Sequence, residues 1–350
     1  MIAVPLRKTS YAALVASIAL LASCSAAQDI EVGSDWKGSE TFVTARVSGR
    51  TVVVGIDPAA RHAQTLAVVP RADGDDDVAA PQLVRSGDGT WWLSLPGEGG
   101  HGDRLFRLDP ARHALEERGS IGQQTELVPG RRLLATVPAA DGPGGPGAAG
   151  RRTAEVLVRD AKTWKRVRGA RVPGPVTLTA PDPSGDSVCL AAGEDDGMEV
   201  SVLDLATGRV RRAGRSPGVQ VQQLACAAGV PVLAGSPAAD GGGTAVRAAL
   251  SHVDGATVVS VTGGRVDAVQ ATEGTVVLAV NRGQDSDLVE LDRASGRELR
   301  RVTADGVDDS YLLRPTRSGW LMVSDDTATV VDLTGGTSHT FDLPGPLTSL

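Results

Sequence analysis

The chain has 350 residues, 41% of them hydrophobic and 22% charged, so it carries enough apolar material for a folded core and too much for a disordered protein. Its 35 basic and 42 acidic residues give a net charge of -7, and a chain beginning at Cys24 would carry -9 with 33 basic residues. Because a nucleic-acid backbone is bound mainly through Lys and Arg, this balance argues against a nucleic-acid partner.

The N-terminal segment has the layout of a secretory signal. Arg7 and Lys8 precede an apolar stretch from Tyr11 to Leu21, and small residues follow. This stretch of 11 residues is too short for a membrane-spanning helix, which needs roughly 20 residues. We therefore expect the segment to be removed rather than retained.

The end of this segment, Leu21-Ala22-Ser23-Cys24, resembles the lipobox of bacterial lipoproteins. The resemblance implies that residues 1–23 are a lipoprotein signal peptide and that the Cys24 thiol carries a diacylglyceryl group. Two acyl chains suffice for stable anchoring, so the protein would be exported and held on the outer face of the cell membrane. Residues 24–40 would then form a polar tether. The alternative is an ordinary signal peptide with a chance cysteine.

The next predicted elements belong to a repeat marked by aspartate. Seven times, a strand-like run ends in an Asp that opens a short polar loop before another run, at intervals of 52, 51, 44, 50, 38 and 40 residues: Asp57, Asp109, Asp160, Asp204, Asp254, Asp292 and Asp332. An Asp carboxylate can accept a backbone N–H two residues further on, and a later residue in the left-handed conformation then closes the turn. The pattern therefore indicates seven turns rather than a row of catalytic acids.

A second marker alternates with the first. Glycines separate another pair of strand-like runs in each repeat: Gly89, Gly130, Gly185, Gly229, Gly274 and Gly319. Each repeat thus contains four strands, and a period in the forties is typical of a propeller blade. We predict an all-β fold, a seven-bladed β-propeller of four-stranded antiparallel blades over residues 41–350.

The repeats resemble those of seven-bladed propellers of the quinoprotein-like or YVTN type, whose outer hairpin reads as an apolar-Asp pair, Thr-Gly and a basic strand. Leu203 to Val210 (LDLATGRV) and Leu291 to Leu299 (LDRASGREL) match closely, whereas the other blades are degenerate. The tryptophan docking motifs of true quinoprotein dehydrogenases do not recur at the blade period, and we assign no cofactor.

The chain also suggests how the ring closes. Leu343 to Leu350 (LPGPLTSL) matches Val172 to Thr179 (VPGPVTLT), which leads into an inner strand. We predict that the C-terminal strand completes the first blade and so removes two exposed sheet edges. The alternative makes Phe42 to Ser48 the inner strand, turning at Gly49.

The remaining cysteines, Cys189 and Cys226, lie in apolar strand-like runs. They can form one disulfide in an oxidising compartment, or they can be two buried thiols, and their spacing does not decide between these states.

Two catalytic motifs match by letter only. Gly214 to Gly218 fits Gly-x-Ser-x-Gly, but that motif requires a strand-to-helix turn. Gly145 to Gly150 fits a dinucleotide fingerprint, but a strand follows it where a helix is needed. The five histidines are scattered, and we assign no catalytic or metal-binding residue.

Two other features could bind ligands. The loops between second and third strands and those between blades should emerge on one acidic face, for which solvated acids are favoured over a Ca²⁺ site: Asp73 to Asp77, Gly193 to Glu199, Asn281 to Asp287 and Asp325-Asp326. The inner strands should line the central channel, where the polar candidates for ligand binding are Gln220, Gln222, Gln223, Gln270, Asp308 and Asp309.

These observations favour a lipid-anchored extracytoplasmic propeller that acts as a binding or scaffold module for a protein or cell-envelope ligand. The alternative is a lactonase-like propeller hydrolase that uses a metal in the central channel, and a quinone-dependent dehydrogenase is a third. The sequence does not identify the ligand.

Overall fold

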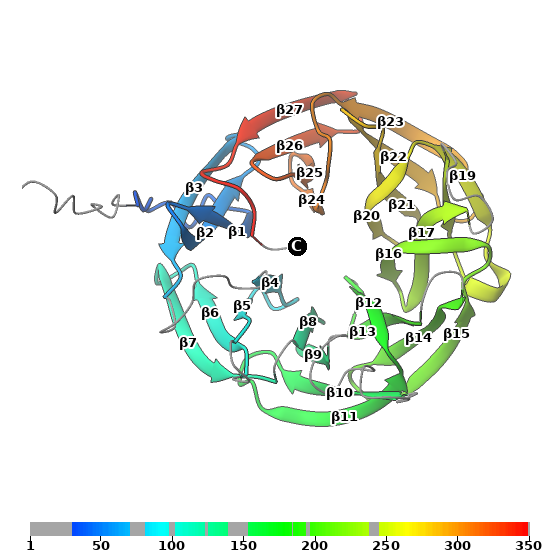
Figure 1. Ribbon diagram of the computed structural model, residues 1–350, viewed down its shortest axis with the longest axis horizontal. Coiled ribbons are helices and arrows are strands. Elements are labelled where there is room, and N and C mark those ends of the chain that lie inside the picture. Colours follow the sequence, from blue (N-terminus) through cyan, green and yellow to red (C-terminus); the bar gives the residue numbers. More distant parts are fainter. Residues whose placement is uncertain are drawn as a thin grey trace, which may run out of the picture.

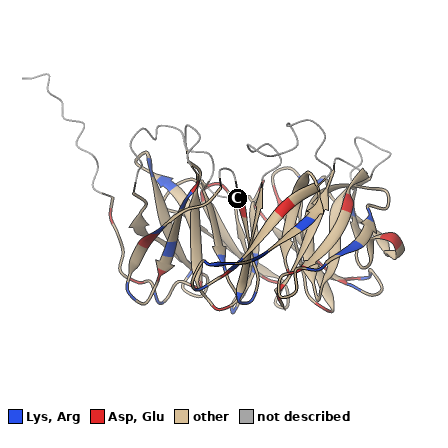
Figure 2. Ribbon diagram, turned by 90° about the horizontal axis from the view of Figure 1, so that it is seen from below, with Lys and Arg blue, Asp and Glu red and all other residues tan. Residues whose placement is uncertain are grey.

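The computed structural model describes residues 30–70, 81–97, 102–122, 125–138, 153–183, 185–193, 197–237 and 245–348. In these residues the chain forms seven antiparallel sheets arranged in a ring around a central channel, which confirms the seven-bladed β-propeller (Figure 1). Seen from the side, the ring is a shallow disc whose strands run between two faces (Figure 2). No helix in the described ranges is long and apolar enough to cross a membrane.

Six blades contain four consecutive strands each. Blade 2 consists of β4 (Gln82–Arg85), β5 (Trp91–Leu95), β6 (Arg104–Asp109) and β7 (Ala114–Ser120). Blade 3 consists of β8 (Thr125–Pro129), β9 (Leu133–Pro138), β10 (Thr153–Asp160) and β11 (Arg166–Pro173). Blade 4 consists of β12 (Val176–Pro181), β13 (Ser187–Ala192), β14 (Glu199–Asp204) and β15 (Val210–Arg215).

The next blades repeat the order from channel to rim. Blade 5 consists of β16 (Val219–Ala227), β17 (Val230–Pro237), β18 (Ala245–Ala249) and β19 (Val258–Thr262). Blade 6 consists of β20 (Arg265–Ala271), β21 (Thr275–Asn281), β22 (Ser286–Asp292) and β23 (Glu298–Ala304). Blade 7 consists of β24 (Leu312–Thr316), β25 (Gly319–Val323), β26 (Thr327–Asp332) and β27 (Thr337–Asp342).

Blade 1 is built from both ends of the folded region. It contains β1 (Thr41–Val47), β2 (Arg50–Asp57) and β3 (His62–Val68), and the C-terminal segment lies inside β1. Ala45 bridges Leu347, the Arg46 N–H donates to the Pro346 carbonyl at 2.7 Å, and the Thr348 N–H donates to the Thr44 carbonyl at 2.9 Å. Closure by the C-terminal segment is thus confirmed, although the segment forms a single bridge rather than a full strand. The alternative, β1 as the innermost strand, is wrong.

The core is divided among the seven interfaces between blades, with one buried apolar cluster at each. Second strands such as β5 and β13 are buried almost along their whole length, whereas outer strands such as β7 and β27 are mostly exposed. Since each blade buries apolar side chains against both neighbours, closing the ring buries two further faces.

The aspartate turns have the predicted chemistry in six blades. In each of them an Asp side-chain oxygen accepts a backbone N–H two or three residues further on. The fourth residue after the Asp always has positive φ, between 53° and 73°: Arg61, His113, Trp164, Gly208, Gly296 and Gly336. These aspartates therefore hold turns.

Blade 5 is the exception, and the prediction for Asp254 is wrong. Its strands β18 and β19 are joined by a longer loop, residues 250–257, in which Val253–Gly255 form a short 3-10 turn instead of the tight aspartate turn. The Asp254 carboxylate accepts the Arg215 N–H of the neighbouring blade at 3.1 Å. This aspartate links blades 4 and 5 rather than closing its own turn.

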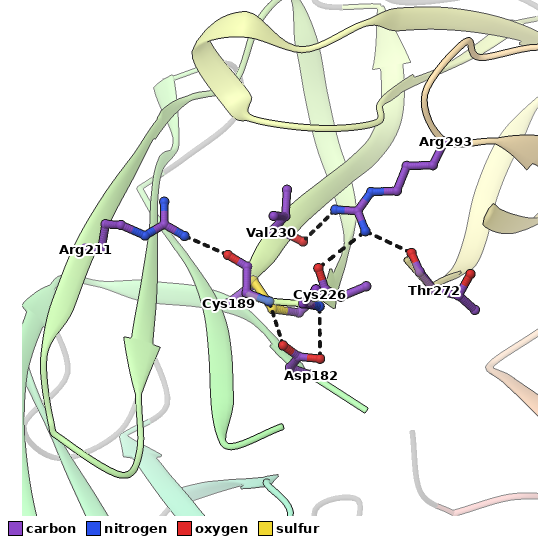
Figure 3. Close-up of a disulfide and its surroundings, with 10 residues drawn as sticks. Asp182, Cys189, Arg211, Cys226, Val230, Thr272 and Arg293 are labelled. Carbon is purple, nitrogen blue, oxygen red and sulfur yellow. Dashed lines mark hydrogen bonds between the residues drawn. A yellow bond between two sulfur atoms is a disulfide. The ribbon is translucent and has the colours of Figure 1, made fainter. Parts of the chain in front are cut away.

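A disulfide joins the same two blades. Cys189 on β13 and Cys226 on β16 are bonded, with Cα atoms 5.6 Å apart, and both side chains are buried (Figure 3). Nearby, the Asp182 carboxylate accepts the N–H groups of Ala228 at 3.2 Å and Gly229 at 2.6 Å. Blades 4 and 5 are therefore linked covalently and by hydrogen bonds near the inner strands.

Arg293 links blade 5 to blade 6 from the interior (Figure 3). It follows the turn aspartate of blade 6, is only 8% exposed, and donates to four backbone carbonyls: Leu250 at 3.0 Å, Ala227 at 3.3 Å, Thr272 at 2.8 Å and Val230 at 3.4 Å. Burial lowers the pKa of its guanidinium, and the charges of Asp182 and Glu273 oppose that effect. The cation is thus held mainly by peptide dipoles rather than by a direct ion pair.

Candidate binding site in the central channel

The central channel contains a cavity of about 640 Å³. The start of β1, residues of five inner strands and Leu347 line it, and it extends to the face that carries the turns between first and second strands, where Gly87 and Gly130 lie. We call this the turn face, and the opposite one, where the chain enters each blade, the entry face. Polar side chains of the cavity wall come from different blades, among them Gln82, Glu126, Thr179, Gln270 and Arg314.

Gln82 joins blades 2 and 3 at the cavity wall. Its side-chain amide donates to the Leu127 carbonyl at 3.0 Å and accepts the Leu127 N–H at 2.6 Å. The amide thus pairs with β8 as a strand backbone would, and this role is structural.

Glu126 on β8 is a half-buried carboxyl group in the cavity wall. Burial raises its pKa, and a hydrogen bond donated by the Thr179 hydroxyl opposes that rise. The side chain therefore keeps its proton to higher pH than an ordinary glutamate.

Replacing Glu126 with Gln should remove a pH-dependent contribution to stability. Because the folded-state pKa is raised above the ordinary value of 4.5, wild type is most stable relative to Glu126→Gln below that pH, and it loses this advantage as pH rises through the folded pKa. The loss is about 1.4 kcal/mol for each unit by which the pKa is raised. Chemical denaturation of both proteins between pH 4 and 8 measures the difference.

Glu117→Gln is the control with the opposite sign. The hydrogen bond from Arg104 is the main cause that lowers the pKa of Glu117, an exposed carboxylate on β7. Its contribution is present above the ordinary value and is lost as pH falls through the folded pKa. Parallel pH profiles for the two variants would contradict the assignment of Glu126.

Arg314 on β24 is half-buried in the cavity wall. Its Cζ lies 5.2 Å from the centre of the Trp91 ring, and its guanidinium donates to the Thr41 hydroxyl at 3.5 Å. Burial lowers the pKa of Arg314 to about 10, and the positive charge of Arg85 contributes to the decrease. Arg314 is therefore still charged at neutral pH.

Arg85 at the end of β4 approaches the same tryptophan. Its Cζ lies 5.8 Å from the Trp91 ring centre, and Arg85 and Trp91 are paired across β4 and β5. Trp91 itself is buried against Phe42, with ring centres 5.0 Å apart. The wall between blades 7, 1 and 2 thus presents two guanidinium groups around one fixed aromatic ring.

Of the predicted channel residues, Gln270 lines this cavity. Gln220 and Gln223 lie on β16, outside the cavity wall, and a register irregularity between Val221 and Gln223 shifts the alternation of that strand. The Gln222 amide donates to the Ser236 hydroxyl at 3.1 Å and accepts the Val266 N–H at 3.4 Å, so it bridges blades 5 and 6.

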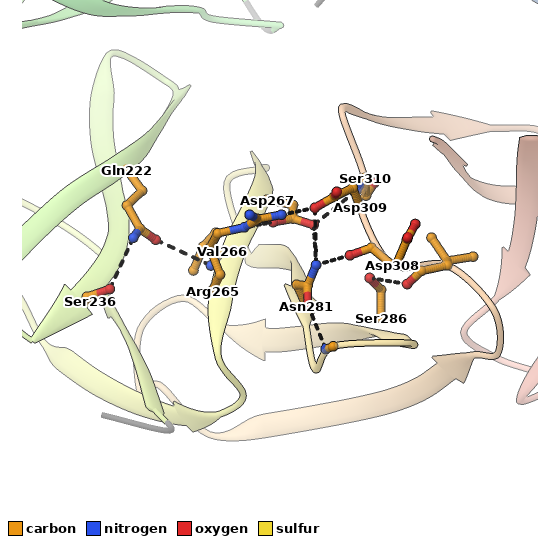
Figure 4. A network of polar contacts seen from close by, with 12 residues as sticks. Gln222, Ser236, Arg265, Val266, Asp267, Asn281, Ser286, Asp308, Asp309 and Ser310 are labelled. Atoms are coloured by element: carbon orange, nitrogen blue, oxygen red, sulfur yellow. Dashed lines mark hydrogen bonds and ion pairs between the residues drawn. The ribbon is translucent and has the colours of Figure 1, made fainter. Parts of the chain in front are cut away.

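Asp308 and Asp309 are not on an inner strand, because β24 begins only at Leu312. They belong to a polar network at the entry face between blades 6 and 7 (Figure 4). Asp309 pairs with Arg265, and Asn281 donates to the Asp308 carbonyl and to Asp309. These two aspartates are engaged in joining blades.

Asp267 is the buried member of the same network, with its side chain 4% exposed. It accepts the Arg265 guanidinium at 2.7 Å and the Ser310 N–H at 3.0 Å. Among the described residues, no group of three or more His, Cys, Asp or Glu side chains could hold a metal ion.

The acidic face is described only in part. Asp73 to Asp77, residues 194–196 and the Gly145–Gly150 fingerprint lie outside the described residues. In the Asn281 to Asp287 loop, Asp287 is fully buried and pairs with Arg282 and Arg301, so it is not a solvated acid. The Gly214–Gly218 motif joins β15 to β16, and its strand-to-strand context differs from a nucleophile elbow.

Sequence reasoning missed Arg85, Glu126 and Arg314. Each lies four or five residues before a turn glycine, at Gly89, Gly130 and Gly319 respectively. A charged residue at that distance before a turn glycine lies on a short inner strand in three blades. This spacing could have identified the three residues from the sequence.

Comparisons with known proteins support the fold. No protein-family model and no curated protein matches the chain. Among solved structures it is similar to a prolyl endopeptidase, with 11% identity and a TM-score of 0.58 over 86% of this chain and 47% of that one. It is also similar to a putative TolB from Agrobacterium tumefaciens (14% identity, TM-score 0.43, 76% and 92% covered) and to Saccharomyces cerevisiae Sqt1 (10%, 0.47, 87% and 82%). The chain spans about half the length of the prolyl endopeptidase, and at 11% identity that likeness concerns the fold alone.

Proposed function

We propose that this protein is a lipid-anchored propeller outside the cytoplasm that binds a protein or cell-envelope ligand. The observation that carries the proposal is the channel cavity of about 640 Å³, whose polar wall comes from separate blades held in fixed positions. Concave sites with a few placed polar groups are typical of binding pockets. No observation on the described residues favours the hydrolase alternative.

Two features support the location. The N-terminal segment combines a basic start, an apolar stretch and the lipobox-like ending at Cys24. The buried disulfide between Cys189 and Cys226 is of a kind that persists mainly in oxidising compartments.

Replacing Cys24 with Ser should release the protein from the membrane. The substitution removes the thiol that would carry the lipid, and a single hydrophobic membrane signal gives at best marginal anchoring. Fractionation of cells that express wild type or Cys24→Ser, followed by immunoblotting, measures the distribution. Equal membrane association of both proteins would show that the lipid anchor is wrong.

Filling the channel tests the binding function. Gln270→Trp places a bulky side chain in the cavity, and we expect recovery of the partner from envelope extracts by cross-linking and mass spectrometry to fall about tenfold or more, the equivalent of about 1.4 kcal/mol. Val258→Trp, on the exposed outer strand β19, is the matched control and should leave recovery unchanged. The same recovery from both variants would place binding outside the channel.

A further inference from the structure

Two of the three arginines of the cavity wall, Arg85 and Arg314, have a charge that the described protein does not neutralise. Among the described residues, no carboxylate oxygen lies within 4.0 Å of a nitrogen of Arg85 or Arg314. Arg314 is half-buried, and its one hydrogen bond to a described residue is the contact of 3.5 Å with the Thr41 hydroxyl. A guanidinium that has lost part of its water normally recovers the cost from an anion.

The acidic groups of the same cavity are engaged elsewhere. The Glu40 carboxylate accepts the Arg317 N–H at 2.9 Å. Asp182 accepts backbone N–H groups of blade 5, and Glu126 accepts the Thr179 hydroxyl. None of them neutralises the arginine pair from within the wall.

Both guanidinium groups approach the same aromatic ring. Both Cζ atoms lie within 6 Å of the Trp91 ring centre, at 5.8 and 5.2 Å, and both side chains line the cavity. Burial is the main cause of the lowered pKa of Arg314, and the positive charge of Arg85 adds to it, as expected for two nearby like charges. An anion between them would relieve both the repulsion and the desolvation.

We propose that Arg85 and Arg314 bind an oxyanion of the ligand, a carboxylate or a phosphate, inside the channel cavity. Guanidinium groups match the geometry of both anions and form charge-assisted hydrogen bonds with them. Both guanidinium groups already lie over the ring of Trp91, a contact that reduces the conformational entropy they lose on binding. The inference rests on the proposed function only in taking the anion to be part of a larger ligand.

The test uses two small anions as probes. The full-length protein, extracted in detergent, is unfolded thermally in increasing succinate or inorganic phosphate, with ionic strength held constant by sodium chloride. A binding anion raises the unfolding temperature in proportion to ln(1 + [L]/Kd), so the titration yields an apparent Kd. We expect saturable stabilisation by at least one probe, succinate if the site is built for carboxylates and phosphate if it is built for phosphoryl groups.

The variants locate the effect. In Arg314→Gln and in Arg85→Gln, the apparent Kd should rise about tenfold or more, because one charge-assisted partner is lost. Arg212→Gln is the matched control, since Arg212 is an exposed arginine on β15 that pairs with Glu199 at 3.3 Å. It should leave the apparent Kd unchanged. Arg85 is exposed, so its variant still reports if Arg314→Gln does not fold.

Absence of stabilisation beyond chloride in the wild type would overturn the inference, and so would equal stabilisation of the wild type and Arg85→Gln. The proposed function fails separately. If the channel-filling variant loses the partner while no anion stabilises the wild type, the oxyanion site is wrong and the binding function stands. If an anion binds and filling the channel leaves partner recovery unchanged, the oxyanion site stands and partner binding in the channel is wrong.

Discussion

Replacing both Cys189 and Cys226 with alanine should lower the free energy of unfolding by roughly 4 kcal/mol. The disulfide closes a loop with a sequence separation of 37 residues, and a cross-link of that span restricts the unfolded chain by about this amount in the chain-entropy model. Alanine is the proper replacement because both sites are buried, and serine would add an unpaired hydroxyl group. Unfolding in guanidinium chloride, followed by tryptophan fluorescence, measures the change.

The matched comparison is the wild type unfolded with and without a reducing agent. Reduction should destabilise the wild type to nearly the level of the double variant and leave the double variant unaffected. Alkylation of the oxidised, unfolded protein should label neither cysteine. Labelling of both residues, or unfolding that does not respond to the reducing agent, would show that the bond is absent.

Replacing Arg293 with Met should destabilise the protein by at least about 3 kcal/mol, because each buried acceptor left unpaired costs about 1 to 3 kcal/mol. Methionine keeps an unbranched apolar stem but cannot donate to the four carbonyls of blades 5 and 6. Part of the loss is offset, since removing a buried guanidinium also removes its desolvation cost. Equilibrium denaturation again gives the free energy.

Arg297→Met is the control for this experiment. Arg297 lies four residues further along in the same loop and is exposed, so its replacement should change stability by no more than about 0.5 kcal/mol. Hydrogen exchange should also locate the damage in Arg293→Met, with faster exchange in blades 5 and 6 than in blades 2 and 3. Equal stability of the two variants would mean that the carbonyls find other donors.

The ring itself was predictable because its signals are local. A turn aspartate marks a hairpin in six blades without any knowledge of neighbours, and in blades 4, 6 and 7 a glycine four positions later marks it again. Asp254 misled the prediction because the same apolar-Asp pair serves a contact with Arg215 in another blade. No local pattern distinguishes a carboxylate that caps its own turn from one that accepts a distant N–H.

The site was predictable only in part, because which residues face the channel depends on strand limits and register. Asp308 and Asp309 fall outside the inner strand since β24 starts at Leu312. Arg293 looks in the sequence like one of several charged residues of an outer hairpin, yet the packing of blade 5 against blade 6 buries it. Whether these side chains face the channel or are buried depends mainly on contacts between blades, and the sequence of a single blade does not reveal those contacts.

The composite first blade also constrains how the protein can be made. The bridge between Ala45 and Leu347 joins residues about three hundred positions apart, so it cannot form until nearly all of the described chain has been synthesised. Until then β1 presents an unpaired edge, which is the kind of surface that invites pairing with other chains. The seam, where the two ends of the folded chain meet, lies in blade 1 because of the order in which the strands are connected and not because of the residues of that blade. A circular permutant opened in the turn at Gly89 should therefore build the same ring with its seam in blade 2.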